Sequence, residues 1–274
     1  MIAENLISSL HNSAFGLSVS QLMFGKTMIV ILASAMIATA DQAADTLTTT
    51  GISEFTAAYQ AWNGARFGKA GDLFNQAAAL TPQSVTNYYW RGTALFHRML
   101  QLRDASDTKS ADAAMDAAVA ALETAVKLDP GHGESHALLG TLYGMKINGS
   151  MIRAIRFGPS VQDHQRQALK NGATNPRVRY LLGTGQFHTA KDAAAKREGL
   201  NTLLKAEQLF VAEAKRPQKP FDPRWGYSSC LTFIGRSYET LGQPSEAADY
   251  YRKSLTEHPE DHIAKAGIKR LSGK

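Results

Sequence analysis

Two short segments of the sequence carry residues that could hold a metal ion. Residues 132–136 and 258–262 each read His, any residue, Glu, any residue, His. Two histidines four residues apart can reach one zinc ion when they share a helical face. Both segments, however, straddle the start of an expected helix, no third ligand is apparent, and neither has the His-Glu-x-x-His order that places a general base beside the metal. We therefore predict no metal site and no other cofactor.

Other residues that commonly carry catalysis occur without the surrounding sequence that catalysis needs. Gly183-Thr184-Gly185 lacks the preceding strand and the following Lys-Ser or Lys-Thr pair of a phosphate-binding loop. No serine or cysteine stands in a nucleophile elbow, and no pair of carboxylates stands out. The single cysteine, Cys230, excludes an intrachain disulfide and a multi-cysteine zinc site. We predict a protein that is not an enzyme and has no catalytic residues.

The composition favours a helical, globular chain. Of the 274 residues, 44% are hydrophobic and 20% are charged, which is ordinary for a globular domain and too polar for several membrane spans. Alanine is abundant, nine residues are proline, and clusters of β-branched residues are scarce. Helices are therefore expected rather than sheets.

Residues 23–40 have the three parts of a secretory signal in order. Lys26 precedes an apolar run that starts at Met28 and is too short to span a bilayer, and small residues stand at the first and third places of the triplet that ends at Ala40. We predict that residues 1–40 are an N-terminal extension and signal peptide cleaved after Ala40. The alternative is a buried N-terminal helix.

Cleavage there would leave a mature chain of residues 41–274 that is periplasmic or secreted and has no transmembrane anchor. Residues 1–40 contain one acid, Glu4, and one base, Lys26, so the mature chain keeps the net charge of +6. A basic chain can bind nucleic acid, but export argues against such a partner.

A pattern of small and aromatic residues near the C-terminus indicates paired helices. Gly235 and Ala247 stand where two antiparallel helices would cross, because a larger side chain would force the helices apart. Tyr238 and Tyr251 would fill the space between neighbouring hairpins. Gly242 would end the first helix of the pair.

This order of residues resembles the tetratricopeptide repeat (TPR), a helix–turn–helix unit of 34 residues. The resemblance implies an all-α fold in which antiparallel helix hairpins stack into a right-handed superhelix. Weaker copies of the pattern extend back to about residue 51. We predict a single TPR-like domain over 41–274, with five hairpins between 51 and 261 and a capping helix at 262–271 that covers the last hairpin.

Two of these hairpins are expected to have lengthened turns. A polar stretch at 103–112 separates the two helices of the second hairpin, and residues 157–160 fall in the turn of the third. Insertions at 103–116 and 144–160 could close the groove of the superhelix into a pocket.

An internal duplication supports the repeat independently of any family. Residues 89–97 and 180–188 lie in two different expected hairpins and share Tyr, Gly, Thr, Phe and His at identical spacing. Five matches in nine positions favour duplication over chance.

The resemblance also implies where a partner would bind, because one face of each first helix lines the concave groove in TPR proteins. Aromatic rings with polar tips give contact area at little conformational cost. The same rings could instead pack hairpin against hairpin. The residues carried over to the binding groove are Tyr59, Trp62, Tyr89, Phe96, His97, Arg177, Tyr180, Phe187, His188 and Arg236.

Positive charge is concentrated between residues 145 and 180, where seven bases face one acid, Asp163. Seven minus one is +6, so this stretch carries the net charge of the whole mature chain. Five of the bases are arginine, which suits bidentate contacts to carboxylate or phosphate. We predict an anion-binding face that takes an acidic segment or an anionic envelope component such as lipid phosphate; the alternative is a merely solvated face. Its residues are Arg153, Arg156, Arg166 and Arg179.

We predict an extracytoplasmic TPR scaffold or adaptor that binds a protein or peptide segment in its concave groove. The alternative is a small-ligand-binding periplasmic TPR protein associated with a transport system. A scaffold needs an open groove, whereas a ligand carrier needs an enclosed pocket of a few hundred cubic ångströms.

Overall fold

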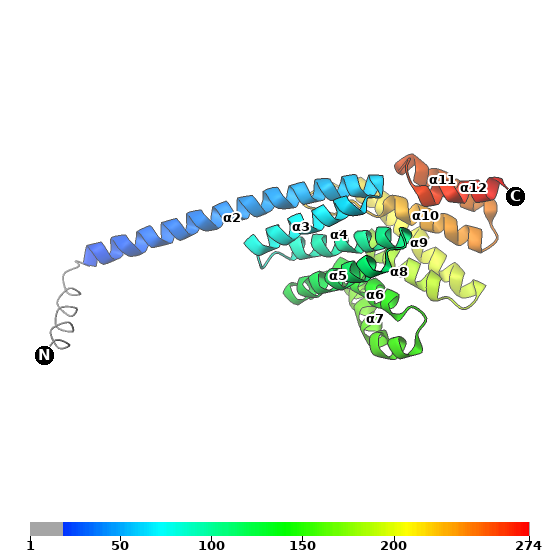
Figure 1. Cartoon of the computed structure of the whole chain (residues 1–274), viewed down its shortest axis with the longest axis horizontal. Coiled ribbons are helices and arrows are strands. Elements are labelled where there is room, and N and C mark those ends of the chain that lie inside the picture. The colour runs from blue at the N-terminus through cyan, green and yellow to red at the C-terminus, as the bar shows by residue number, and fades with distance from the viewer. Residues whose placement is uncertain (1–18, 274) are drawn as a thin grey trace.

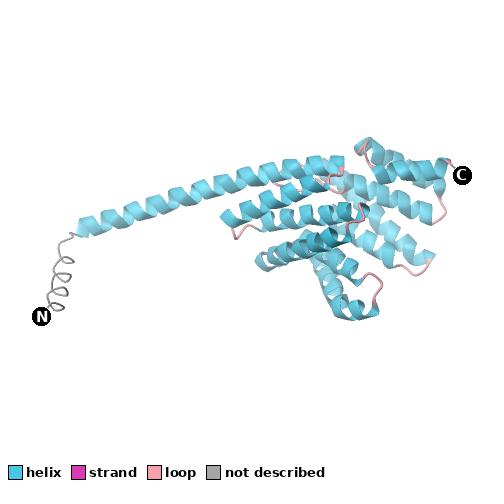
Figure 2. Cartoon of the chain, viewed as in Figure 1, coloured by secondary structure: helices cyan, strands magenta, loops and turns pink. Residues whose placement is uncertain are grey.

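The computed structural model describes residues 19–273, with side chains from residue 38 onward. Within residues 19–273 the chain consists of eleven helices joined by loops and turns, and no strand is present (Figure 2). The helices are α2 (Val19–Ala61), α3 (Gly64–Leu80), α4 (Val85–Asp104), α5 (Thr108–Leu128), α6 (Gly133–Ile147), α7 (Met151–Gly172), α8 (Pro176–Thr189), α9 (Ala193–Ala214), α10 (Tyr227–Thr240), α11 (Pro244–Glu257) and α12 (His262–Ser272).

Consecutive helices pair as antiparallel hairpins, from α2–α3 to α10–α11, and α12 packs on the last hairpin (Figure 1). Glycines permit the close crossings within the hairpins. A Cβ atom added to Gly183 would lie 2.9 Å from Leu203 Cγ, and one added to Gly235 would lie 2.8 Å from Tyr251 Cδ1. The predicted all-α solenoid of helix hairpins with a closing helix is confirmed.

The turn of the second hairpin is shorter than we predicted from the polar stretch at 103–112. Helix α4 ends at Asp104 and α5 begins at Thr108. Asp107 caps α5, because its Oδ1 accepts from the Ser110 amide at 3.1 Å. The lengthened turn was a wrong prediction, since a cap at Asp107 lets most of the polar stretch be helical.

The turn of the third hairpin also differs from the prediction. Residues 157–160 lie inside α7, and the turn consists of Asn148, Gly149 and Ser150. Asn148 and Gly149 have positive φ angles of 42° and 73°, which end α6 in a left-handed conformation. Pro159 removes one backbone donor within α7. The carbonyl four residues earlier lies on an exposed turn, where water can take the place of that donor.

Helix α2 is continuous through the predicted cleavage point at Ala40. No helix within residues 38–273, whose side chains are described, is long and apolar enough to cross a membrane. Residues 1–18, and the side chains of 19–37, lie outside the described part of the chain, so the signal peptide remains a prediction. Among the described side chains of α2, burial begins after the cleavage point. The buried residues are Ala44, Thr48, Gly51, Phe55 and Ala58.

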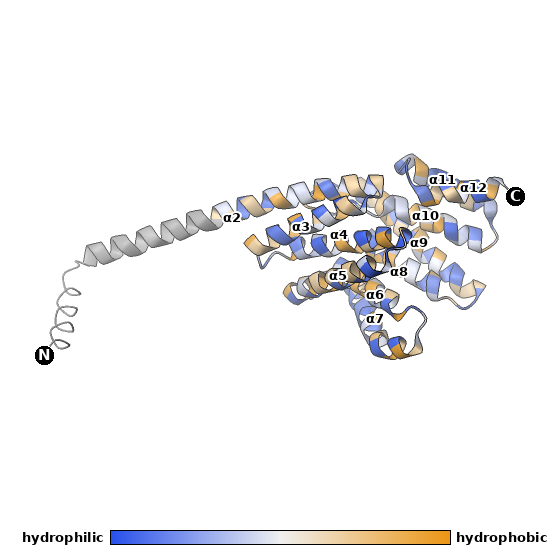
Figure 3. Ribbon diagram, in the orientation of Figure 1, coloured by the Kyte–Doolittle hydropathy of each residue, from blue (hydrophilic) through white to orange (hydrophobic). Residues whose placement is uncertain are grey.

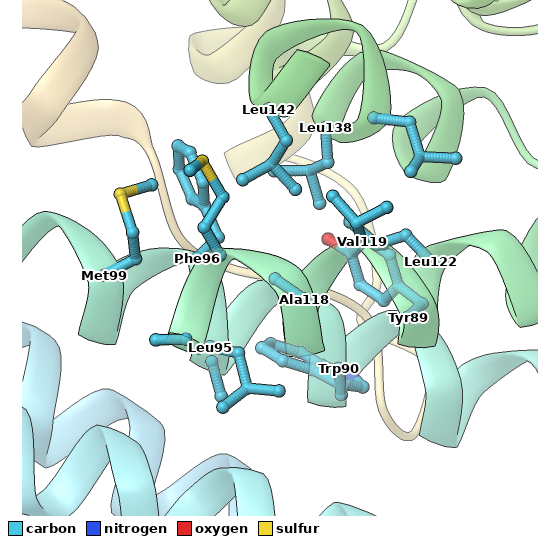
Figure 4. Packing of buried hydrophobic residues seen from close by; sticks show 14 of the residues in the cluster. Tyr89, Trp90, Leu95, Phe96, Met99, Ala118, Val119, Leu122, Leu138 and Leu142 are labelled. Atoms are coloured by element: carbon cyan, nitrogen blue, oxygen red, sulfur yellow. The ribbon is translucent and has the colours of Figure 1, made fainter. Parts of the chain in front are cut away.

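The largest buried cluster extends from α2 to α8 and includes Trp225 from the segment before α10. Figure 4 shows its centre, where side chains of α4, α5 and α6 meet. Leu138 and Leu142 of α6 are fully buried there, as is Leu122 of α5. Smaller clusters hold α9 against α10 and α11 against α12. The position of Trp225 shows that one connection crosses the stack.

Candidate binding groove

The face formed by the first helices of the hairpins is covered in its middle by residues 215–226, which connect α9 to α10. This connecting segment reaches back to α4. Trp90 Nε1 donates to the Phe221 carbonyl at 3.0 Å, and Trp225 Nε1 donates to Tyr89 Oη at 2.9 Å. The Trp225 ring also meets the His97 ring edge-on, with centroids 5.1 Å apart. The groove is therefore partly filled by the chain itself, rather than closed by insertions at 103–116 and 144–160.

The connecting segment takes this path because its sequence cannot continue a helix. Prolines at 217, 220 and 223 remove backbone donors and fix φ. Asp222 bonds back to Lys219, whose amide donates to Asp222 Oδ2 at 2.9 Å. Gly226 starts α10 with a φ angle of 105°, which L side chains rarely adopt, and its Cα faces the Phe210 ring.

A pocket of about 380 Å³ remains between α2, the connecting segment and the end of α11. Aromatic rings from α2, α4 and the connecting segment form its walls. At one end His258 Nε2 donates to the Gln60 carbonyl at 2.7 Å, so the last hairpin is tied to the first. The residues that line the pocket include Phe55, Thr56, Tyr59, Gln60, Trp90, Lys219, Asp222, Arg224, Trp225, Glu257 and His258.

A buried network of charged groups lies beneath the connecting segment. Arg177 Nε donates to Glu134 Oε1 at 2.9 Å, and the same guanidinium binds Glu213. Tyr89 Oη donates to Glu134, and Asn175 Nδ2 donates to Glu134 Oε1 at 2.6 Å. Arg177 is 2% exposed and Glu134 is 7% exposed. The network therefore joins α4, α6, α8 and α9 in the interior.

The charges of this network hold each other ionised. Burial raises the pKa of the Glu134 carboxyl, but Arg177 and the hydrogen bonds from Tyr89 and Asn175 outweigh burial, so this pKa lies below its ordinary value. Burial lowers the pKa of the Arg177 guanidinium, but Glu134 and Glu213 together raise this pKa by more than burial lowers it, so the net shift is upward. Arg177 is thus an internal counter-ion.

His97 is buried next to this network and is neutral at pH 7. Burial lowers the pKa of its imidazole to about 4, although Nδ1 lies 2.8 Å from the Thr93 carbonyl. Its ring contacts Phe55, Phe67 and Trp225. His97 therefore packs as an aromatic residue rather than as a cation.

The structure distributes the ten predicted groove residues among three environments. Tyr89, Phe96, His97, Arg177 and Phe187 are buried, Tyr59, Trp62 and Tyr180 are partly buried, and His188 and Arg236 are exposed. Of the ten, Tyr59 lines the pocket described above, with its hydroxyl bonded to Ser229.

Sequence reasoning missed the aromatic residues Trp90 and Trp225 as walls of the pocket. The available signal was the run of three prolines in residues 215–226, which marks a long non-helical connection. Its course across the face of the stack depends on contacts that lie more than a hundred residues away in the sequence.

The histidines of segments 132–136 and 258–262 contact protein groups in the structure. His132 caps α6, and its Nδ1 accepts from the Ser135 amide at 3.2 Å. His136 Nδ1 lies 2.9 Å from His164 Nδ1 on α7. Among the described side chains, no group of three or more His, Cys, Asp or Glu residues could hold a metal ion.

The four arginines of the predicted anion-binding face differ in their surroundings. Arg153 and Arg156 are exposed and line a cleft of about 820 Å³ beside the turn of the third hairpin. Arg166 pairs with Asp163 at 3.2 Å, and Arg179 Nε donates to the Ala173 carbonyl at 2.8 Å. Arg153 and Arg156 are therefore the pair that shares one surface.

The stack of antiparallel hairpins with small residues at the crossings defines the chain as a TPR-like repeat protein. The sequence profile of the family described as Regulator of microtubule dynamics protein 1-3 matches residues 55–274, and the chain belongs to this family. No curated protein sequence matches the chain.

Solved structures show the same fold. The TPR protein TTC0263 of Thermus thermophilus superposes with a TM-score of 0.56 at 15% identity, over 82% of this chain and 100% of that one. The Cut9–Hcn1 hetero-tetramer of the APC/C has a TM-score of 0.54 at 16% identity, over 90% of this chain and 39% of that one. At such identities the likeness concerns the fold alone.

Proposed function

We propose that this chain is an exported TPR scaffold that binds a short stretch of a protein or peptide in the pocket between α2 and the connecting segment. The observation that carries the proposal is the pocket itself, about 380 Å³ in volume, with aromatic walls and a polar rim. Binding sites commonly combine apolar walls with a few polar groups that fix orientation.

The chemistry of the rim suits a polypeptide partner. Lys219 and Arg224 offer two cations from the connecting segment, and Asp222 and Glu257 offer two acids. An acidic segment would meet the two cations, while its apolar side chains would contact Tyr59 and the neighbouring rings. The family is named for regulating the dynamics of microtubules, which are protein polymers. A protein-binding role for this chain accords with that name.

The proposal is tested by filling the pocket. Thr56 lines the pocket on α2, is exposed, and bonds only to the Ile52 carbonyl of its own helix, so Thr56→Trp is expected to obstruct the pocket while leaving the fold intact. Thr49→Trp is the matched control. Thr49 lies two helical turns earlier, is exposed, and makes the same type of bond, to the Asp45 carbonyl.

A photo-crosslinking residue at Gln60, on the rim, would identify the partner in cells that express the protein. We expect polypeptide adducts at Gln60 that Thr56→Trp abolishes and Thr49→Trp preserves. A crosslinker at the exposed Arg197 on α9, away from the pocket, controls for nonspecific crosslinking at the protein surface. Equal adducts in the Thr56→Trp and Thr49→Trp backgrounds would refute binding in the pocket.

A second candidate function is the binding of a small ligand, because the volume of the pocket lies within the range of small-molecule sites. Native mass spectrometry of the purified protein separates the two functions. A discrete small-molecule adduct that is lost in Thr56→Trp would favour a ligand carrier over a scaffold.

The exported location is tested separately. Cleavage after Ala40 would leave Asp41 as the first residue, and the buried face of α2 that begins at Ala44 would be retained. N-terminal sequencing of the protein from its native compartment is expected to start at Asp41. A mature protein that still contains Met28 would refute export by this signal.

A further inference from the structure

The first turns of α7 expose three large aliphatic side chains next to one another. Met151 and Ile152 are each 80% exposed, and Ile155 is 76% exposed. Single exposed hydrophobic residues are common, but a contiguous group marks an interaction surface. No other helix among the described side chains has three such residues within five positions.

The first turns of α7 expose two adjoining arcs, one aliphatic and one cationic. At about 100° per residue, Met151, Ile155 and Ile152 fall within one arc of about 100°. Arg156 and Arg153 occupy the adjoining arc. On the opposite side Phe157 stacks on Tyr143 of α6, with ring centroids 5.8 Å apart. The packed side is thus satisfied within the hairpin, while the three aliphatic side chains stay at least 76% exposed.

This part of α7 lies at the free end of the α6–α7 hairpin, which projects from the stack (Figure 1). Hydrophobic and hydrophilic residues stand side by side there (Figure 3). Ser150 fixes the start of the helix, because its Oγ accepts from the Arg153 amide at 3.4 Å. A flat surface can therefore reach the aliphatic arc without displacing another element.

The charged side chains beside the aliphatic arc on α7 are arginines. Across the cleft, acidic and basic side chains balance each other. Arg153 and Arg156 are exposed. The facing helix α5 contributes Asp112 and Asp116, and Lys146 Nζ binds Asp116 Oδ1 at 2.6 Å. The outer surface of α7 therefore presents aliphatic side chains and guanidinium groups together.

We propose that the first turns of α7 dock on the surface of an anionic lipid bilayer, with Met151, Ile152 and Ile155 inserted at the boundary of the acyl chains. Interfacial helices combine these features, because their apolar side chains enter the bilayer while cations remain at the level of the phosphates. Arginine is suited to phosphate contacts. The end of the hairpin projects from the stack, so a bilayer surface can reach it. The inference is independent of binding in the pocket near Tyr59.

Flotation of the full-length protein with lipid vesicles tests this proposal. One set of vesicles is phosphatidylcholine, and in the other about a third of the lipid is anionic phosphatidylglycerol. We expect binding to the anionic vesicles that weakens as salt is added, because salt screens exposed charges. Ile152→Ser with Ile155→Ser, and Arg153→Gln with Arg156→Gln, should each reduce the partition coefficient at least about tenfold.

Matched controls remove the same chemistry elsewhere on the surface. Leu80→Ser with Val211→Ser deletes two exposed aliphatic side chains, and Arg197→Gln with Arg252→Gln deletes two exposed arginines. Neither control should change vesicle binding. All variants retain residues 1–40, so any contribution of that segment to binding is common to them. Equal binding by the α7 variants and the controls would overturn the proposal.

A local probe keeps the test valid even if a variant folds poorly. Cys230 is fully buried, so a thiol-reactive, environment-sensitive fluorophore would label Ile155→Cys selectively. Its emission should shift to the blue on addition of anionic vesicles, whereas the same fluorophore on Val211→Cys should not respond. An unshifted probe at 155 on vesicle-bound protein would overturn the proposal. So would a blue shift that appears without vesicles and depends on protein concentration, because a second copy of the chain would then cover this surface.

Discussion

Residues 89–97 of α4 and residues 180–188 of α8 carry the same five residue types at the same spacing, yet their environments differ. Tyr89 and His97 are 3% and 4% exposed, whereas Tyr180 is partly buried and His188 is exposed. The connecting segment contributes to this difference, because Trp225 contacts Tyr89 and His97. Phe55 and Phe67 of the first hairpin add two more rings against His97. In the α8 copy, His188 meets the ring of Phe233 at 5.3 Å and that of its neighbour Phe187 at 6.5 Å between centroids, and no ring of the connecting segment is recorded against it.

The comparison separates what a local pattern determines from what the tertiary structure adds. In both copies the glycine faces a leucine of the partner helix, Leu122 in one hairpin and Leu203 in the other. This contact belongs to the hairpin and recurs with the sequence. The burial of Tyr89 and His97 instead depends in part on a segment that follows α9, which no repeat pattern encodes.

The largest effect is expected where a buried charge network joins α4 and α8, the two helices that carry the copies. Tyr89 of α4 and Arg177 of α8 both bind Glu134. Arg177→Met would leave Glu134 buried without its counter-ion, and the loss of one partner of a buried pair costs about 3–5 kcal/mol. Urea unfolding measures this loss. Arg236→Gln, an exposed arginine of α10, should stay within about 0.5 kcal/mol of the parent. A small loss for Arg177→Met would mean that water reaches Glu134.

Removal of Trp225 should make the two copies more alike. Trp225→Ala deletes a ring that is 3% exposed, and such substitutions cost about 3–5 kcal/mol. Because water would then reach the His97 ring, its pKa should rise from about 4 towards the ordinary value of 6.5. NMR titration of the histidine ring protons reports this change. The pKa of His188 should not move, and a parallel shift of both histidines would contradict the assignment of burial to Trp225.

The acid sensitivity of folding should also distinguish the two histidines. The folded-state pKa of His97 is lowered from 6.5 to about 4, so its contribution to stability is present above about pH 6.5 and is lost as pH falls towards 4. Between pH 8 and pH 5 this loss amounts to about 2 kcal/mol. His97→Phe keeps an aromatic ring without the titrating group. Its free energy of unfolding should therefore fall less with acid than that of the parent.

The matched variant is His188→Phe. Partial burial, together with the charges of Arg236 and Lys196, lowers the pKa of His188. Because water reaches this exposed ring, we expect a smaller change in the pH slope. If His188→Phe flattens the slope as much as His97→Phe does, the two environments are equivalent and the comparison fails.

Much of the fold followed from residue spacing, since Gly235, Ala247 and Tyr251 have geometric roles that every TPR hairpin repeats. Helix ends were less predictable, because capping at Asp107 and Ser150 overrode the polar and proline-containing stretches beside them. The site was the least predictable part. The periodicity of α4 marks Tyr89 and His97 as facing inward, but it does not state whether a partner or the chain itself covers them.

The smallest effect is expected at the threonines of the two copies, where the contact is local. Thr93 Oγ1 donates to the Tyr89 carbonyl at 2.9 Å, and Thr184 Oγ1 donates to the Leu181 carbonyl at 2.8 Å. Each hydroxyl bonds to its own helix, so replacement by valine leaves no buried group of another element without a partner. Thr93→Val and Thr184→Val should each change the free energy of unfolding by less than about 1 kcal/mol, and the two changes should agree within about 0.5 kcal/mol. Urea unfolding of both variants tests this agreement. A much larger loss at Thr93 would show that the connecting segment also governs the local contacts of α4, and the separation between local pattern and tertiary cover would then no longer hold.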